Sequence, residues 1–285
     1  ASKGEGLGNK FLANIREVDA IIHVVRCFED ENILRDEGPI NPVGDKEIIE
    51  TELQLKDLES VEKKIQRTEK IAKNDPKSKA ELDILIRCKE HLEKGKNILS
   101  LGLTKEEQPA IADLFLLTLK PVLYVANVDE ASMHTGNKFS AALIEAVKNE
   151  GNEVIIMTNA IEAQIAEFDN PEDKAMFMEE YKMTEPALDR LIHSTYKLLN
   201  LSTYSTAGVQ EVRAWTIHKG WKAPQAASVI HTDFEKGFIK AEVISYTDFI
   251  HYGSEAACRD NGKLRIEGKE YPVQDGDVMH FRFNV

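Results

Sequence analysis

An asparagine and a carboxylate follow one apolar run at a spacing that could bind a nucleotide base. Residues 121–126 are Pro-Val-Leu-Tyr-Val-Ala, and Asn127 and Glu130 come directly after them. The side-chain amide of Asn127 can hydrogen bond to a purine ring nitrogen, and the carboxylate of Glu130 can accept a hydrogen bond from a base N–H. A polar turn after a strand is also common without any ligand, so the motif alone leaves both interpretations open.

The elements that would position these residues are strands of a parallel sheet. Apolar runs of strand length alternate with helical patterns, the strands at residues 19–28, 121–127 and 153–160 and the clearest helix at residues 139–149. Such alternation predicts an α/β fold with helices on the faces of the sheet. Because ligands bind beyond the carboxyl ends of such strands, Asn159 and Ala160 are predicted to form a second loop against the same base.

A helical hairpin interrupts the α/β pattern between the first two strands. Apolar residues recur at near-helical spacing on both sides of a turn at residues 74–77, namely Leu55, Leu58, Val61, Ile65, Ile71, Leu82, Leu85, Leu92 and Leu99. Two amphipathic helices joined by one turn predict an antiparallel hairpin at residues 45–111. The α/β domain then comprises residues 1–44 and 112–201. The many charges of the hairpin are either a solvated face or a partner-binding surface.

Residues 202–285 form a domain of a different kind. Strand-like segments lie at residues 212–217, 238–244, 263–266, 270–273 and 278–283, and a short helix with proline in its first turn lies at residues 223–230. One helix packed on a small mixed sheet is a ubiquitin-like β-grasp. Trp215 and Phe238 are predicted to be core residues. His231 has no second or third ligand at metal-binding spacing, so we predict a structural role for it and no metal site.

Composition narrows the classes of function. The net charge of −13 argues against coating of nucleic acid by the whole molecule, although a local basic face is compatible with it. Three distant cysteines show neither a disulfide framework nor metal spacing, which indicates a reducing, cytoplasmic environment. No run of about 18 apolar residues occurs, so no membrane span is expected.

A phosphate-binding loop is missing from the sequence. Nucleotide hydrolases of this fold carry Gly-x-x-x-x-Gly-Lys-Ser/Thr between a strand and a helix, and the 285 residues contain no such run. The glycine-rich residues 4–8 lack the Gly-Lys-Ser/Thr ending, and no strand precedes them. We therefore predict a flexible loop leading into a helix at residues 9–17.

Several segments together resemble the YchF group of Obg-like ATPases, a subfamily of P-loop NTPases. The resemblance extends in order over essentially the whole chain and includes Gly-Glu-Gly-Leu-Gly-Asn at 4–9, His-Val-Val-Arg-Cys-Phe at 23–28, Asn-x-x-Glu at 127–130, Glu-Val-Arg-Ala-Trp-Thr at 211–216, His-Thr-Asp-Phe-Glu-Lys-Gly-Phe at 231–238 and Asp-Gly-Asp-Val-Met-His-Phe-Arg-Phe-Asn-Val at 275–285. It implies a partial G-type P-loop domain with an inserted coiled-coil hairpin and a C-terminal TGS domain. The segment with the phosphate loop, first switch and metal turn is then expected to be absent at the N-terminus.

The same resemblance implies a function and the residues that carry it. Family members hydrolyse ATP, and GTP less selectively, with Mg²⁺, so the fragment alone is expected to be inactive. Asn127 would face the purine ring, Val128 would meet the base edge through its backbone, and Glu130 would occupy the corner where GTPases hold aspartate. Asn159 and Ala160 would form the second base loop.

The hydrolytic residue stays unassigned. Some family members hold a histidine in the loop at residues 32–35, and here that place is taken by Arg35. The Mg²⁺ ligands are expected in the absent N-terminal part.

Partners are predicted from local basic groups. Ribosome or RNA contacts could come from Lys63, Lys64, Arg67 and Lys70 in the hairpin and from Lys236, Lys240, Arg265 and Arg282 in the C-terminal domain. The alternative function is a non-enzymatic adaptor that binds the ribosome or RNA through the hairpin and the TGS domain.

Overall fold

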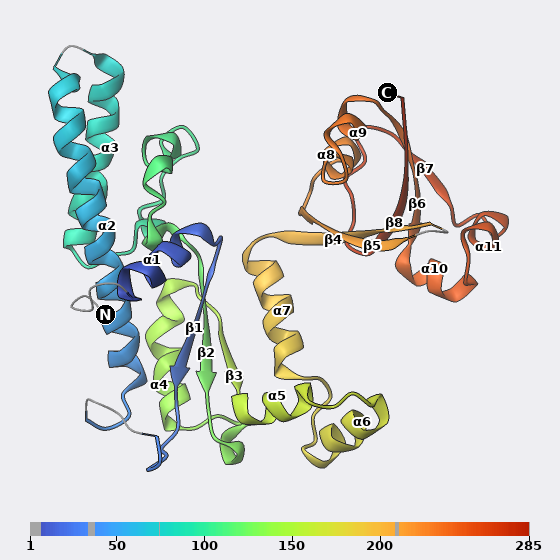
Figure 1. Cartoon of the computed structure of the whole chain (residues 1–285), viewed down its shortest axis with the longest axis horizontal. Coiled ribbons are helices and arrows are strands. Elements are labelled where there is room, and N and C mark those ends of the chain that lie inside the picture. The colour runs from blue at the N-terminus through green and yellow to red at the C-terminus, as the bar shows by residue number, and fades with distance from the viewer. Residues whose placement is uncertain (1–6, 34–37, 74, 209–210, 285) are drawn as a thin grey trace. The chain divides into compact units, whose positions relative to one another are not determined.

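The chain folds into two compact units, Ala1–Thr195 and Tyr196–Val285. The computed structural model describes residues 7–33, 38–73, 75–208 and 211–284 (Figure 1). The division falls within the last helix of the first unit, whereas the sequence places the domain boundary after Leu201. None of the helices in the described ranges is long and apolar enough to span a membrane.

A three-stranded parallel sheet forms the centre of the first unit. Its strands lie in the order β1-β2-β3 and are β1 (Ile21–Arg26), β2 (Val122–Asn127) and β3 (Val154–Met157). Asn127 at the end of β2 aligns with Arg26 of β1 and with Met157 of β3. The parallel sheet predicted from the alternation of strands and helices is therefore confirmed, and the carboxyl ends of all three strands meet at one edge.

Helices pack on both faces of the sheet because β2 is apolar from Val122 to Ala126 and buried from Leu123 to Ala126. The helices of this unit are α1 (Leu7–Glu17), α2 (Pro42–Ala72), α3 (Pro76–Glu93), α4 (Lys138–Val147), α5 (Asn159–Ala166), α6 (Pro171–Glu180) and α7 (Ala187–Leu198). Short 3-10 turns are η1 (Ile98–Leu101), η2 (Gln108–Ala110), η3 (Ala112–Leu114), η4 (Leu117–Leu119), η5 (Glu130–Ser132) and η6 (Lys148–Glu150). On one face of the sheet Leu143 of α4 packs with Tyr124, and on the other Ala187 of α7 packs with Val125.

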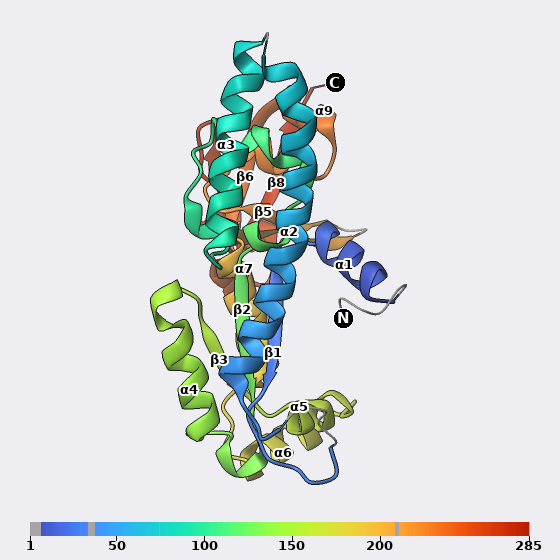
Figure 2. The same cartoon turned by 90° about the vertical axis from the view of Figure 1, so that its left-hand side faces the viewer.

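Helices α2 and α3, which we call the helix pair, lie side by side and extend away from the sheet (Figures 1 and 2). Each helix begins with a capping side chain followed by proline, Asn41-Pro42 for α2 and Asp75-Pro76 for α3. Buried residues between the two helices and the following turns are Val61, Leu85, Cys88, Leu92 and Ile98. Not all of the predicted apolar stripe is buried, because Leu55, Ile71 and Leu99 are exposed.

The second unit is a five-stranded mixed sheet with short helices. Its strands are β4 (Leu201–Ala207), β5 (Val212–His218), β6 (Phe238–Ser245), β7 (Arg265–Glu267) and β8 (Asp277–Phe283), in the order β5-β4-β8-β6-β7. Its helices are α8 (Ala223–Ser228), α9 (Thr232–Lys236), α10 (Tyr246–Tyr252) and α11 (Glu255–Asp260). Strands β4 and β8 pair in parallel and the other neighbours are antiparallel.

One predicted strand of this unit is wrong. Residues 270–273 form only an isolated bridge between Lys222 and Pro272, because proline has no N–H to continue a ladder. The prediction of Phe238 as a core residue is confirmed, since it is 3% exposed. Trp215 is partly buried against the same core. His231 has the structural role predicted for it, because its Nδ1 accepts a hydrogen bond from the N–H of Asp233 and caps α9.

Candidate functional site

The loops that follow β2 and β3 are joined to each other by hydrogen bonds. The N–H of Val128 donates to the carbonyl of Met157 at 2.9 Å. The N–H of Asn159 donates to Oδ1 of Asn127 at 3.1 Å, and the hydroxyl of Thr158 lies 3.4 Å from the carbonyl of Asp129. The structure therefore brings both predicted base loops together at the carboxyl edge of the sheet.

The orientation of the Asn127 amide follows from its partner. A backbone N–H can only donate, so the atom of Asn127 that faces Asn159 must be the carbonyl oxygen. The amino group of Asn127 is then left as the donor on the other side. A purine N7, which is an acceptor in both adenine and guanine, matches this donor.

Acceptors dominate the rest of this edge. Val128 is buried and its N–H is engaged, while its carbonyl receives no hydrogen bond among the described residues. Oδ1 of Asn159 is also buried and has no partner in the part of the chain that the structure describes. Ala160 is exposed at the start of α5 and follows Asn159 directly in the chain.

Glu130 is exposed at the start of η5, and the neighbouring carboxylate, Asp129, has a structural role. Asp129 caps the turn, because its Oδ1 accepts a hydrogen bond from the N–H of Ser132 at 3.0 Å. Burial raises the pKa of the Tyr181 hydroxyl, and the negative charge of Glu130 raises it further. Tyr181 at the end of α6 therefore lies beside the Glu130 carboxylate. The sequence gives no signal for this contact, since Tyr181 belongs to no motif near residues 127–130.

The loop after β1 is held by Arg26. Its guanidinium donates hydrogen bonds to the carbonyls of Phe28, Asp30 and Ile33. Arg35, which occupies the place of the suspected catalytic histidine, lies outside the described residues. Among the residues that are described, no group of three or more histidine, cysteine, aspartate or glutamate side chains could hold a metal ion.

The fold and this edge together define an α/β protein in which two strand-end loops converge on one hydrogen-bonding surface. A family model named YchF-GTPase_C, described as "Protein of unknown function (DUF933)", matches residues 201–284. The chain is 54% identical over 286 residues to the Haemophilus influenzae protein named ribosome-binding ATPase YchF, and 52% identical over 288 residues to the Bacillus subtilis protein of the same name.

Both alignments cover 100% of this chain and 78% of the relative. A solved structure of the Schizosaccharomyces pombe YchF GTPase matches with a TM-score of 0.85 at 38% identity, covering 99% of this chain and 77% of that one. The chain belongs to the YchF family, which confirms the resemblance drawn from its motifs.

Proposed function

We propose that this chain forms the base-binding part, the helix pair and the C-terminal domain of a ribosome-binding ATPase. The observation that carries the proposal is the hydrogen bond between Asn159 and Asn127, which joins the two base loops into one surface. The names of the Haemophilus influenzae and Bacillus subtilis relatives support ATP as substrate and the ribosome as partner. A cytoplasmic location follows from such a partner.

The hydrogen-bonding groups at this edge favour adenine. The amino group of Asn127 matches N7 of either purine, so Asn127 selects purines without separating them. The carbonyl of Val128 is an acceptor, which suits the N6 amino group of adenine and repels O6 of guanine. Asn159 and Ala160 close the other side of the base site, and the Glu130 carboxylate beside Tyr181 is the corner that decides how well GTP competes.

The residues of the two base loops do not account for binding of the nucleotide's phosphates, which needs other groups. Hydrolysis of the bond between the β- and γ-phosphates by water depends on positioning and on neutralisation of charge. Mg²⁺ would supply part of that neutralisation, and the described residues offer no cluster to hold it. Strand β1 exposes Ile22 and Val24 on one face, at 42% and 52%, which fits a further part of the nucleotide-binding domain packing on this face of the sheet.

We assign the remaining parts to partner contacts. The helix pair corresponds to the coiled-coil hairpin of the family and residues 202–285 to its TGS domain. The mixed order β5-β4-β8-β6-β7 and helix α8, which packs on β6, support a β-grasp.

The choice of base can be tested in the full-length protein. We expect tighter binding of ATP than of GTP, and we expect Glu130→Asp to move the preference toward GTP by roughly 1–3 kcal/mol, the scale of one good base contact. Isothermal titration of both nucleotides against both proteins measures the shift. Ala131→Ser, a change beside Glu130 that touches no proposed base contact, is the matched control. Strong preference of the unmodified protein for GTP would contradict the assignment of ATP.

Residues 1–285 alone are expected to bind nucleotide with a Kd of about a millimolar or weaker, because base contacts must offset the whole entropic cost of association. They are expected to release no phosphate from ATP above a heat-denatured control. Ligand-observed NMR measures the weak binding and a radiolabelled phosphate assay measures hydrolysis. Turnover by these residues would show that the phosphate-binding groups lie within them.

A further inference from the structure

The turn of the helix pair carries a concentration of positive charge in an acidic protein. Residues 67–80 contain five cations and two carboxylates, a net charge of +3, whereas the whole chain carries −13. We call the five cations Arg67, Lys70, Lys73, Lys77 and Lys79 the tip cations, and all of them are exposed. One of the two carboxylates, Asp75, is engaged in capping α3 through the N–H groups of Lys77 and Ser78.

The tip cations differ from most other basic side chains considered for partner binding. Lys63 pairs with Glu59 at 2.6 Å, and Lys64 pairs with Glu81 at 2.9 Å. Two predicted cations of the helix pair are thus already neutralised. In contrast, no ion pair within the described ranges involves any of the tip cations, although Lys77 interacts electrostatically with Asp75.

The C-terminal domain shows the same neutralisation. Arg282 lies 3.1 Å from Glu242, and Lys240 lies 3.8 Å from the same carboxylate. Arg265 lies 3.5 Å from the buried Asp277. Of the four cations that the sequence singled out in this domain, only Lys236 has no ion pair among the described residues. The structure therefore favours the helix pair over the C-terminal sheet as the electrostatic contact.

The spacing of the tip cations suits a row of anions. Arg67 and Lys70 lie in the last turns of α2 and Lys73 is its C-cap, so the three recur every three residues, about 4.5 Å apart along the axis at 1.5 Å per residue. Lys77 and Lys79 follow the connection between the two helices and are the second and fourth residues of α3. Two helices side by side form a narrow rod whose end presents these charges together.

We infer that the tip cations bind the phosphate backbone of structured RNA, an inference that rests on the proposed ribosome partner and names the surface that meets it. RNA helices are recognised mostly by shape and by phosphate and 2′-hydroxyl contacts, which a row of exposed cations can make without base specificity. A membrane surface fits less well, because Ile71 is the one large apolar side chain that is strongly exposed among the described residues from Arg67 to Ala80, and interfacial helices need a whole apolar face.

The test compares two charge-reversed double variants of the chain. Arg67→Glu/Lys70→Glu changes the tip, and Lys94→Glu/Lys96→Glu makes the same charge change at the other end of the helix pair. Both pairs lie near the C-terminus of their helix, so any penalty from the helix dipole is similar. The probes are a fluorescein-labelled RNA stem-loop and purified ribosomes, and far-UV circular dichroism checks folding.

We expect the tip variant to bind the stem-loop roughly ten-fold or more weakly at moderate salt and to lose about two units of the salt-dependence slope, one for each lost phosphate contact. The control variant is expected to retain most of the binding. Equal affinity of the tip variant and the unmodified chain, or equal loss in both variants, would overturn the inference.

Three further measurements distinguish RNA binding by the tip from contacts of a different kind. If the unmodified chain fails to bind ribosomes, the proposed function is contradicted. If the tip variant still binds ribosomes as the unmodified chain does, only the assignment of the contact to the tip cations is contradicted. If ribosome binding is insensitive to salt and is lost in Ile71→Ser, the contact is an apolar one with a protein and the assignment to RNA is overturned. Equal tip-dependent binding to phosphatidylserine vesicles would show attraction to any polyanion and would overturn the assignment to RNA.

Discussion

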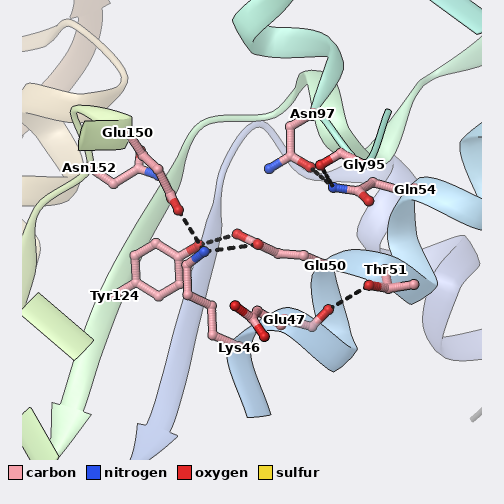
Figure 3. Close-up of polar contacts among 10 residues, drawn as sticks. All are labelled: Lys46, Glu47, Glu50, Thr51, Gln54, Gly95, Asn97, Tyr124, Glu150 and Asn152. Atoms are coloured by element: carbon pink, nitrogen blue, oxygen red, sulfur yellow. Dashed lines mark hydrogen bonds and ion pairs between the residues drawn. The ribbon is translucent and has the colours of Figure 1, made fainter. Parts of the chain in front are cut away.

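Replacing Lys46 with methionine is expected to lower the free energy of unfolding of the first unit by about 3 kcal/mol. Lys46 is 4% exposed, and its Nζ lies 2.8 Å from Glu50 and 2.6 Å from Glu150 (Figure 3). Methionine fills the space without a charge, so two carboxylates would face each other without their cation. The expected loss is at the lower end for a broken buried ion pair because Glu150 is one-third exposed.

The two units can be followed separately in this experiment. Both tryptophans, Trp215 and Trp221, lie in the second unit. The unfolding transition followed by tryptophan fluorescence should therefore have the same midpoint denaturant concentration in wild type and variant. Far-UV circular dichroism, which includes the long helices α2 and α3, should show the loss. A shift of the fluorescence transition by the same amount would mean that the two units unfold together.

The matched control removes the unpaired charges as well. Lys46→Met/Glu50→Gln/Glu150→Gln is expected to recover much of the stability, because replacing a whole buried ionic group is often neutral whereas breaking it is not. Equal destabilisation of the single and triple variants would show that packing of the Lys46 chain, and not its charge, stabilises the unit.

The pKa of Lys46 sets the pH range of this contribution. Burial alone would lower the pKa, but the hydrogen bonds and charges of Glu150 and Glu50 outweigh it and raise the pKa above 10.5. A lysine whose pKa is raised by folding stabilises the folded state fully below its unfolded pKa. The contribution should therefore persist at neutral pH and disappear only as the pH rises through the raised value.

The sheet and its strand ends could be predicted from the sequence because each depends on a short stretch of consecutive residues. An apolar run such as residues 121–126 is compatible with a strand buried on both faces, and Asn127 comes directly after it. Since parallel strands end at one edge, placing Asn159 near Asn127 required only the strand order. Strand β4 (Leu201–Ala207) was not predicted, because Ser-Thr-Tyr-Ser-Thr has no apolar run and only its pairing with β5 and β8 makes it a strand.

Contacts between distant polar residues could not be predicted in this way. Lys46 and Glu50 look like an ordinary helical pair at i and i+4, and nothing in their spacing shows that Tyr124 donates a hydrogen bond to Glu50 at 2.7 Å. The placement of Tyr181 beside Glu130 is equally hidden. The neutralisation of Lys64 by Glu81 and Asp113 also depends on how the chain folds back. Charge density along a sequence therefore overstates the number of cations free to bind a partner.

Helix α2 meets the segment around β2 at a second buried polar contact, made by Asp57. This carboxylate is fully buried and accepts hydrogen bonds from the N–H of Leu117 at 2.9 Å and from the N–H and hydroxyl of Thr118 at 2.7 and 2.8 Å. Asp57 thus holds η4, which leads directly into β2. Together with Glu50 and Tyr124, it fixes the helix pair to the strand that ends in Asn127.

Asp57→Ala is expected to destabilise the first unit by about 4 kcal/mol, because it leaves two buried N–H groups without acceptors and creates a cavity. Asp57→Asn keeps the shape and one acceptor oxygen and should cost less. Thr118→Val removes only the hydroxyl and should cost about 1 kcal/mol. Urea unfolding followed by circular dichroism measures all three, with tryptophan fluorescence again reporting the second unit. If Asp57→Ala proved as stable as wild type, these hydrogen bonds would not be needed, and the helix pair would be held to β2 by apolar packing and the Lys46 contacts.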